Sequence, residues 1–343
     1  MSIKTSLRNS IAQLLFLSGF TSPAKRSRGR FSIVTFHRVL PENERNNYPF
    51  PGLVVTPEEL DSFLSYFTAH FDCGSISAQH ERYLSGEKTE RPLLAITFDD
   101  AQYDNFINAR PILARHQVKA SFFAPVEAVE RHELLWHDRL GFAILALLQQ
   151  GDSGQAKLLQ ILADAGMRVS DPHNLAISAV QASKELPLES RLRLVAELVE
   201  ASGTSQVPDF ARMMTLKELA VLANEGHEIG SHSMTHCMMP ECDDDALVYE
   251  LAESRRVLQA HLSRPINAFC YPNGNCDART ASAVATAGYS LAVTTAWGHN
   301  GEKSDRFRLH RCDIDAKRVQ DATGNFLPAL LAFRMSGFYP GLA

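Results

Sequence analysis

From residue 31 onward, short apolar runs rich in β-branched and aromatic residues alternate with stretches whose apolar positions recur at helical spacing. This alternation is typical of parallel strands joined by crossover helices. Strands are predicted at 31–36, 93–98, 120–125, 228–231, 268–271, 290–294 and 307–310. Helices are predicted between them at 57–71, 105–115, 216–224, 244–262 and 278–287. The pattern therefore predicts an α/β protein.

The number of strand and helix units, about seven, favours a closed or partly open parallel barrel over an open nucleotide-binding sheet. Neither a G-x-G-x-x-G nor a G-x-x-x-x-G-K-[S/T] loop occurs, so nothing indicates a dinucleotide or a triphosphate. Residues 132–210, approximately, break the alternation, since they are rich in Leu and Ala at helical spacing. We expect a helical insertion there, within a barrel that covers 31–343, which would form a lid or a wall for a substrate.

The composition is that of a globular protein. Of its 343 residues, 45% are hydrophobic and 21% are charged, which is enough to bury a full core. The net charge of −5 comes from interspersed acidic and basic residues, so there is no broad positive surface for nucleic acid. The six cysteines lack C-x-x-C spacing, which favours free thiols in a reducing compartment. We expect a cytoplasmic protein, and no feature indicates an obligate protein partner.

Residues 1–30 are predicted to form a helical, basic extension. Lys4 and Arg8 precede an apolar stretch from Ile11 to Phe20, which is shorter than the roughly 20 residues that span a bilayer. A signal peptide would need a small-x-small cleavage site, but a basic run over 25–30 follows instead. Two interpretations stay open: a helix packed on the barrel, or an amphipathic helix peripheral to the inner membrane, where basic residues meet anionic lipid.

Reactive side chains gather in three segments, each at or just after the C-terminal end of a predicted strand. In a parallel barrel this is where the active site lies. The first segment ends in Asp99 and Asp100. Adjacent carboxylates repel each other, so they persist more readily where a cation binds one of them. Taken alone, a strand that ends in two Asp residues is more often a turn or a helix cap than a site.

The second segment contains His232 and His236. On one helical turn both imidazoles would face the same way, at a spacing suited to one divalent metal, although such a pair is also compatible with ordinary exposed or core histidines. With a carboxylate from the first segment, they form a set that leaves a coordination position open for water. The third segment ends at the Tyr-Pro-Asn-Gly turn 271–274, whose free amides could stabilise an oxyanion.

In this order and spacing, the segments resemble the polysaccharide deacetylases of carbohydrate esterase family 4, the NodB-homology group. The matching patterns are T-F-D-D-G, with Ala101 in place of Gly, H-S/T-x-x-H, and an aromatic-Pro-x-Gly turn. Residues 35–39 (Thr-Phe-His-Arg-Val) are similar to the entry strand of members from exopolysaccharide and lipopolysaccharide loci. Those members also carry an insertion around a Trp-His/Trp-Asp motif, which is matched here by residues 136–138. The resemblance covers 31–125 and 212–315, approximately, and implies a distorted parallel (β/α)7-type barrel.

The resemblance also implies a metal-dependent hydrolase that removes N-acetyl groups from an amino sugar. Carried over by position, Asp100, His232 and His236 bind the metal, and Asp99 is the general base that activates the attacking water. The metal and the backbone N–H of Tyr271 would hold the developing oxyanion. Zinc fits this ligand set best, and Co²⁺, Ni²⁺, Mn²⁺ and Fe²⁺ are compatible with it.

The remaining roles follow less directly from the resemblance. Some members have an Arg that orients the base where this chain has Cys270, so Arg264 or another group is expected to orient Asp99. The general acid of the family, a His near the last strand, has its nearest match in His310, which is also compatible with a packed strand residue. His37, at the end of the first predicted strand, is a second candidate and a predicted substrate-binding residue.

Pro272 and Trp297 are the other predicted substrate-binding residues, with Trp297 either a stacking platform for a sugar or an ordinary core residue. The expected substrate is an N-acetylated glycan or its lipid-linked precursor. Deformylation or deacetylation of a lipid-linked amino sugar and O-acetyl ester hydrolysis are close chemical variants. The intact ligands and base argue against a non-catalytic glycan-binding relative, but the missing Arg and the unassigned general acid keep that alternative open. A structural zinc protein would normally have four protein ligands.

Overall fold

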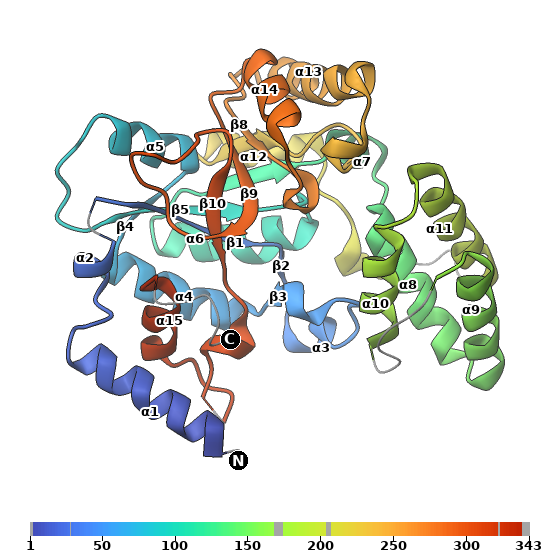
Figure 1. Cartoon of the computed structure of the whole chain (residues 1–343), viewed down its shortest axis with the longest axis horizontal. Helices are drawn as coiled ribbons and strands as arrows, with labels where there is room; N and C mark the ends of the chain where they lie inside the picture. The colour runs from blue at the N-terminus through green and yellow to red at the C-terminus, as the bar shows by residue number, and fades with distance from the viewer. Residues whose placement is uncertain (1–2, 28, 168–173, 204–206, 322, 338–343) are drawn as a thin grey trace.

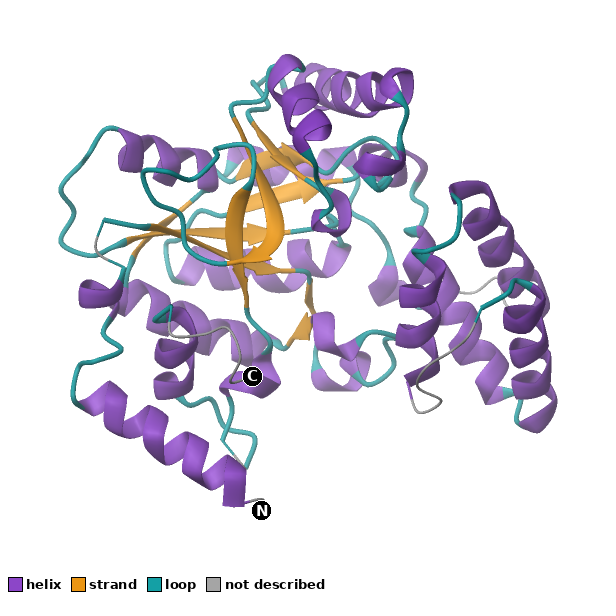
Figure 2. Ribbon diagram, viewed as in Figure 1, coloured by secondary structure: helices purple, strands orange, loops and turns teal. Residues whose placement is uncertain are grey.

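The computed structural model describes residues 3–27, 29–167, 174–203, 207–321 and 323–337. Its centre is a closed barrel of seven parallel strands (Figure 1 and Figure 2). In order around the barrel they are β1 (Phe31–Phe36), β5 (Leu93–Phe98), β6 (Ser121–Ala124), β7 (Glu228–Ser231), β8 (Ala268–Cys270), β9 (Leu291–Trp297) and β10 (Leu309–Asp313). The barrel closes because β1 pairs with both β5 and β10. The expected (β/α)7-type fold is confirmed.

Three short strands have no counterpart in the sequence prediction, because two or three residues are too few to show a period. β4 (Asp72–Gly74) pairs with the first half of β5, whose second half pairs with β6. β2 (Arg38–Val39) and β3 (Val54–Val55) form a separate parallel pair just after the end of β1. These short strands add to the edge of the barrel and leave the order of its seven strands unchanged.

Helices cover the outside of the barrel, as crossover connections require. The longer ones are α4 (Pro57–His70), α5 (Ile76–Leu84), α6 (Arg110–Arg115), α7 (Val126–Arg131), α12 (Leu216–Asn224), α13 (Asp244–Leu262), α14 (Ala278–Thr286) and α15 (Pro328–Met335). Short segments are α3 (Glu42–Arg45), η1 (Pro51–Leu53), η2 (Asn105–Ala109), η4 (Asp209–Ala211), η5 (Met239–Glu241), η6 (Pro272–Gly274) and η7 (Ala316–Val319). The predicted helix 105–115 is the π-helical η2 continued by α6.

The barrel interior is apolar at its N-terminal end and polar at its C-terminal end. Alternate residues of a strand share a face, so Phe31, Ile33 and Thr35 follow one another along the inside of β1. Phe31 and Ile33 belong to an apolar cluster with Leu309 of β10. Two residues further along each strand, Arg311 donates a hydrogen bond of 2.9 Å to the hydroxyl of Thr35. On β1 and β10, the inward-facing residues therefore change from apolar to polar toward the end where a site was predicted.

The stretch predicted as a helical insertion contains α8 (Trp136–Gln149), α9 (Asp152–Asp164), α10 (Leu175–Ser183) and α11 (Leu188–Ser202), at the right of Figure 1. These helices surround an apolar cluster of their own, which Tyr48 and Phe50 from the segment between β2 and β3 join. The helical bundle is thereby packed onto the mouth of the barrel. The domain boundaries at 30 and at 132–210 remain predictions.

At the N-terminal side, α1 (Ile3–Leu17) and α2 (Pro23–Arg26) precede the barrel. Figure 1 shows α1 at the lower left, next to α15. Within the described ranges, no helix is both long enough and apolar enough to cross a membrane.

Candidate active site

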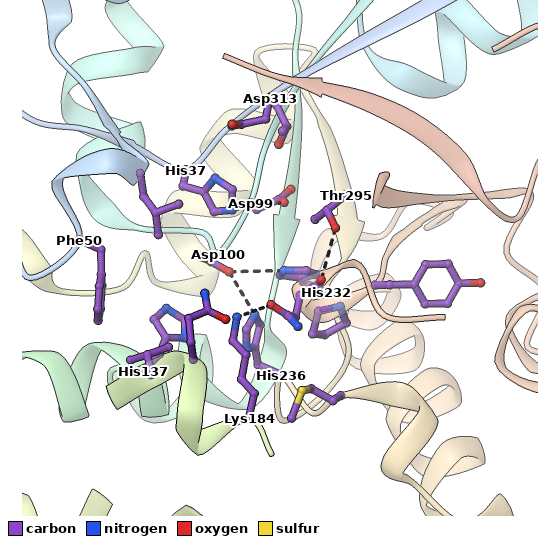
Figure 3. A pocket seen from close by; sticks show the side chains of 18 of the residues that line it. His37, Phe50, Asp99, Asp100, His137, Lys184, His232, His236, Thr295 and Asp313 are labelled. Carbon is purple, nitrogen blue, oxygen red and sulfur yellow. Dashed lines mark hydrogen bonds and ion pairs between the residues drawn. The ribbon is translucent and has the colours of Figure 1, made fainter. Parts of the chain in front are cut away.

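A cavity of about 530 Å³ opens at the C-terminal end of the barrel strands, where the active site was predicted. Ligand sites commonly have volumes of roughly 300–1,000 Å³. The barrel forms one side of the cavity and the helical insertion the other (Figure 3). Seven of the nine predicted site residues line it: His37, Asp99, Asp100, His232, His236, Tyr271 and Pro272.

Asp99 and Asp100 form the turn that ends β5. The N–H of Asp99 donates to the carbonyl of Phe36, which continues the β1–β5 ladder by one residue. Asp100 and Ala101 then adopt positive φ angles of 69° and 49°. This turn directs the Asp100 carboxylate toward the two histidines, while Asp99 stays over the barrel interior (Figure 3). The two adjacent acids therefore occupy different environments, as a division of roles requires.

His232 and His236 lie in the loop after β7, so the prediction of a shared helical turn is wrong. Positive φ angles at Ser233 and His236, 65° and 58°, fold the loop so that both imidazoles face Asp100. One carboxylate oxygen of Asp100 lies 3.4 Å from Nε2 of His232 and 3.2 Å from Nε2 of His236. Loop geometry, rather than helical periodicity, brings the three groups together.

The buried carboxylate of Glu250 in α13 holds this loop. It accepts hydrogen bonds from the backbone N–H groups of Met234 and Thr235 and from the Thr235 hydroxyl, at 2.6–2.9 Å. These two residues lie between the histidines, so Glu250 fixes the path of the loop that carries both imidazoles. The sequence analysis did not identify Glu250, because it lies on a helix 14 residues after the motif with no pattern of its own.

The donor set of Asp100, His232 and His236 fits a divalent cation. The candidate ligand atoms lie within 4.8 Å of one another, and all three residues are buried. Burial lowers the pKa of His236 to about 4, so its imidazole is neutral at neutral pH, the form that binds metals. Burial also acts on His232, but Cys270 and Asp100 raise its pKa, so a bound cation has to displace a proton there.

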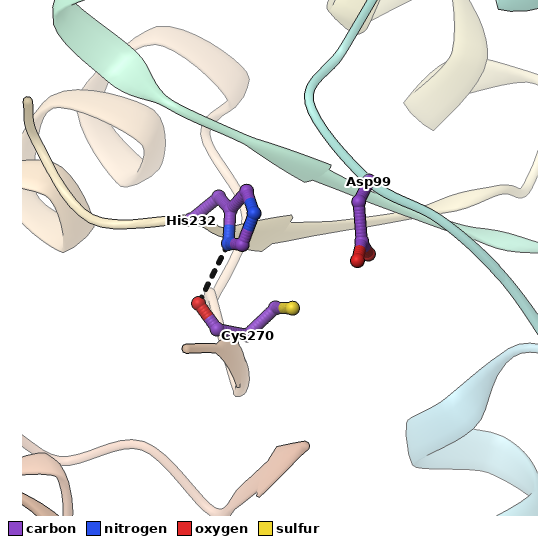
Figure 4. A group of neighbouring side chains, drawn as sticks. All are labelled: Asp99, His232 and Cys270. Atoms are coloured by element: carbon purple, nitrogen blue, oxygen red, sulfur yellow. Dashed lines mark hydrogen bonds between the residues drawn. The ribbon is translucent and has the colours of Figure 1, made fainter. Parts of the chain in front are cut away.

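A second cluster of potential ligands, Asp99, His232 and Cys270, is chemically less suited to a metal (Figure 4). Nδ1 of His232 lies 2.7 Å from the backbone carbonyl of Cys270, so Nδ1 carries the proton and only Nε2 is left as a ligand. Burial raises the pKa of the Cys270 thiol, which disfavours the thiolate that metals bind. The carbonyl bond instead orients His232 toward Asp100, as the outer hydrogen bonds of metal-binding histidines commonly do.

Arg311 of β10 is the group that orients Asp99. Its guanidinium donates two hydrogen bonds to the Asp99 carboxylate, of 2.8 and 2.7 Å, and both side chains are buried. Burial alone would raise the pKa of Asp99, but the charge and hydrogen bonds of Arg311 leave it below its usual value. Asp99 is therefore ionised at neutral pH.

Of the two alternatives expected to orient Asp99, Arg264 or another group, Arg264 lies elsewhere. It donates to the Ala223 carbonyl and the Asn224 side chain, at the C-terminal end of α12. The missed residue, Arg311, does have a signal in the sequence. Because Leu309 is apolar and strand residues alternate, Arg311 shares its inward face and belongs at the polar end of the barrel.

His37 and Asp313 stand on the same side of the cavity as Asp99 (Figure 3). Nε2 of His37 is 3.8 Å from the Asp99 carboxylate, and the His37 side chain is 21% exposed. Burial raises the pKa of Asp313, and the nearby His37 and Arg334 oppose that rise. His37 does not belong to the proposed ligand set, and its imidazole lies beside Asp99, the predicted base.

The expected oxyanion role of Tyr271 does not agree with the structure. Its backbone N–H donates to the carbonyl of Val293, at 3.1 Å, and so belongs to the β8–β9 ladder. An amide already bonded in the sheet has no free hydrogen for an oxyanion. Tyr271 lines the cavity, and its hydroxyl donates to the carbonyl of Phe307.

The turn after Tyr271 is nevertheless built as predicted. Pro272 lines the cavity, and Gly274 closes the turn at a φ of 73°. A Cβ on Gly274 would clash with the side chain and backbone of Thr295 in β9. Only glycine permits this close approach, which places the turn against the neighbouring strand.

His310 and Trp297 do not line the cavity, which corrects two predictions. His310 alternates with the inward-facing Leu309 and Arg311, so it is exposed on the outer face of β10. Trp297 lies at the end of β9, where the guanidinium carbon of Arg334 stands 4.4 Å from the centroid of its ring. Neither residue is placed to contact a substrate in the cavity.

The insertion supplies residues that the sequence analysis did not assign to the site. Trp136 and His137 of α8, and Gln181 with Lys184 at the end of α10, line the cavity. The ring centroid of His137 is 5.6 Å from that of His236. Lys184 donates a hydrogen bond of 2.6 Å to the side chain of Asn273 in the 271–274 turn, so the insertion reaches across to the barrel rim.

Three comparisons with known proteins agree with this architecture. Residues 197–292, which include His232, His236 and the 271–274 turn, match the polysaccharide deacetylase family. The curated Bacillus subtilis (strain 168) protein "Putative polysaccharide deacetylase YxkH" is 22% identical over 117 residues, which are 34% of this chain and 42% of YxkH. The match thus spans less than half the length of that relative.

Among solved structures, the Streptococcus pyogenes deacetylase PplD in complex with acetate has a TM-score of 0.57 at 18% identity, covering 89% of this chain and 98% of PplD. The structure of IcaB from Ammonifex degensii has a TM-score of 0.53 at 15% identity, covering 89% of this chain and 97% of IcaB. At these identities the structures support the fold. With the family match, they confirm the resemblance to polysaccharide deacetylases.

Proposed function

We propose that this chain is a metal-dependent hydrolase that removes N-acetyl groups from an amino sugar in a bacterial surface polysaccharide or its lipid-linked precursor. The observation that carries the proposal is the pairing of two sites in one cavity. Asp100, His232 and His236 converge as a cation site, and Asp99 beside them is held ionised by Arg311. A cation and a clamped carboxylate side by side suit the activation of water for attack on an amide.

Asp100, His232 and His236 would hold the ion, and zinc fits this set of nitrogen and oxygen donors best. When bound, such an ion polarises the amide carbonyl and makes a nearby water more acidic. Three protein ligands leave room for water or substrate, whereas a structural zinc site normally has four. This argues for a catalytic rather than a structural role.

Asp99 acts as the general base in this proposal. It accepts a proton from the attacking water, whose oxygen bonds to the carbonyl carbon of the acetamide group. The two hydrogen bonds from Arg311 fix the orientation of the carboxylate without removing all of its acceptor capacity, because a carboxylate has about four lone-pair sites. Arg311 is thus a positioning residue for the base.

His37 is our candidate for the general acid. It protonates the amine nitrogen as the carbon–nitrogen bond breaks, and the products are acetate and a free amino sugar. Its placement inside the cavity next to Asp99 supports this role, whereas His310 lies outside the cavity. Asp313, on the same side of the cavity, is suited to stabilise the protonated imidazole.

The cavity wall is compatible with a sugar. Trp136 and Phe50 provide aromatic surface, and Gln181, Lys184 and Asn273 provide polar groups at its rim. Aromatic faces with a few placed hydrogen-bonding groups are typical of ligand cavities. Deformylation of a lipid-linked amino sugar and O-acetyl ester hydrolysis would use the same catalytic groups. These reactions are therefore distinguished by assaying each substrate.

Metal content and acetate release should be measured together on the purified full chain. After reconstitution with zinc, we expect about one equivalent of metal, as one three-ligand site holds one ion, and acetate release from N-acetylglucosamine oligomers. His232→Ala should lose both, and Asp99→Asn should keep the metal but lose acetate release. His261→Ala, an exposed histidine of α13, is the matched control and should keep both.

Three outcomes would contradict parts of the proposal. A wild-type chain that retains no metal would exclude the mechanism as written. Acetate release by Asp99→Asn would remove the base assignment. Glycan binding without release of acetate, formate or ester-linked acetyl groups would favour a non-catalytic glycan-binding protein.

A further inference from the structure

Helix α1 (Ile3–Leu17) presents large apolar side chains to solvent along one face. Leu7, Ile11, Leu14 and Leu17 are 59%, 48%, 69% and 74% exposed. They recur every three or four residues, so they form one continuous stripe along the helix, which we name the α1 stripe. Single exposed apolar residues are common on proteins, but a contiguous group marks an interaction surface.

The opposite face of α1 is already packed against the protein. Ala12 is only 2% exposed, and Phe16 packs on the same core cluster that includes the buried residues of α15. Arg8 donates a hydrogen bond of 3.1 Å to the carbonyl of Gln320, which also ties α1 to the body of the molecule. The α1 stripe is therefore not the face that attaches this helix to its own barrel.

The charge around the stripe is strongly one-sided. Residues 1–30 contain Lys4, Arg8, Lys25, Arg26, Arg28 and Arg30 and no Asp or Glu, a net charge of +6. Because the whole chain carries −5, the residues after 30 carry a net −11. Lys25 and Arg30 are exposed. The segment with the exposed apolar stripe is thus the basic segment of an otherwise acidic protein.

We propose that the α1 stripe binds the surface of a membrane that contains anionic lipid. Such a surface offers acyl chains to the apolar residues and negative headgroups to the basic ones, and an amphipathic helix lying in the interface uses both. A second copy of this chain would bring two +6 segments together, which opposes docking through the same stripe. The acidic remainder of the chain would be repelled by the same surface, so α1 orients the protein on it.

This inference does not rest on the proposed activity, since α1 contributes no residue to the cavity. Membrane docking would nonetheless favour one class of substrate. Docking through α1 holds the barrel beside the membrane, where a lipid-linked amino sugar would be anchored. A soluble polysaccharide fragment would not need this arrangement.

The test is flotation of the full chain with vesicles of phosphatidylglycerol and phosphatidylcholine, compared with phosphatidylcholine alone. We expect binding to the anionic vesicles that weakens when salt is raised from about 0.1 M to about 1 M, because the Debye length falls from about 10 Å to 3 Å. The double variant Ile11→Gln/Leu14→Gln should bind at least tenfold more weakly. Leu188→Gln/Leu192→Gln, which changes two exposed leucines one helical turn apart on α11, should bind as the wild type does.

Acetate release from a soluble oligomer should be the same in all of these proteins, which separates a failure of docking from a failure of the proposed activity. Equal vesicle binding by the α1 and α11 variants would overturn the proposal. So would the absence of wild-type binding to anionic vesicles. A wild-type dimer that dissociates in the α1 variant, without vesicle binding, would assign the stripe to a second copy of the chain instead.

Discussion

A buried ion pair, Asp99 with Arg311, lies at the centre of the candidate site. Each side chain alone would be costly in the barrel interior, because an unpaired buried charge loses its hydration. The planar guanidinium matches the carboxylate with two parallel hydrogen bonds, and its remaining donors reach the carbonyl of Thr294 and the hydroxyl of Thr35. This geometry fixes the base more firmly than a lysine could.

Replacing Arg311 by Met should therefore impair catalysis more than metal binding. We expect kcat/KM to fall on the order of 100-fold, because misplacing a catalytic group by about 1 Å can cost that much. Arg311 lowers the pKa of Asp99, so its removal should raise that pKa and move the acid limb of the pH–rate profile to higher pH. Arg256→Met, on the exposed side of α13, is the control. An unchanged acid limb, with metal retained, would show that Arg311 does not set the charge of the base.

At the scale of elements, the loop after β7 is shaped by contacts from other parts of the chain. The carbonyl of Cys270 in β8 orients His232, and Glu250 in α13 binds the backbone between His232 and His236. Groups in this position around a metal site determine the direction of the ligands and influence affinity. α13 is thus part of the site although it contributes no residue to the cavity.

Glu250→Gln should weaken metal binding by about 10- to 100-fold, the usual effect of losing an outer partner of the ligands. The carbonyl oxygen of the amide can still accept from the N–H groups of Met234 and Thr235, but a neutral amide is a weaker acceptor than the carboxylate. Zinc affinity measured by competition with a chelator would check this. Glu253→Gln, at a partly exposed residue of the same helix that pairs with Arg256, should leave the affinity unchanged. Equal affinities in the two variants would limit Glu250 to a general structural role.

At the scale of the whole molecule, a buried polar network joins the insertion to the barrel. Asp138 in α8 accepts hydrogen bonds from the Tyr48 hydroxyl, at 2.6 Å, and the Gln102 amide, at 3.1 Å. Arg38 of β2 lies 4.0 Å from Asp138 and binds Asp104 at 2.7 Å. The Trp-His-Asp motif therefore has two tasks: residues 136 and 137 line the cavity, and Asp138 anchors the helix that carries them.

Asp138→Ala should loosen the insertion, since it leaves a buried tyrosine hydroxyl and a glutamine amide without this partner. We expect the free energy of unfolding to fall by about 2–4 kcal/mol. Denaturant unfolding would measure the loss, and faster limited proteolysis within 136–202 would locate it. Asp164→Ala, on the exposed end of α9, is the matched control. A variant as stable as the control would contradict an anchoring role for Asp138.

The barrel and the central four residues of the site could be predicted from the amino-acid sequence alone. Strands 31–36, 93–98 and 228–231 agree with the structure to the residue. The first two are mostly apolar runs with clear ends, as is typical of buried parallel strands. Asp99 and Asp100 follow the apolar run 93–98, and the 232–236 motif follows the strand 228–231. Since the carboxyl ends of parallel strands meet at one end of a barrel, strand order alone was enough to bring these groups together.

The neighbouring groups that complete the site depend on how distant parts of the chain pack together. Arg311 and Glu250 act through side chains far from the motifs in sequence, and the backbone pairing that occupies the N–H of Tyr271 depends on the neighbouring strand. His310 was misplaced because a residue's position near a strand end does not give its face, whereas the alternation from Leu309 does. A motif shows which side chains lie at the end of a strand. Contacts with distant parts of the chain determine which of those side chains point into the cavity.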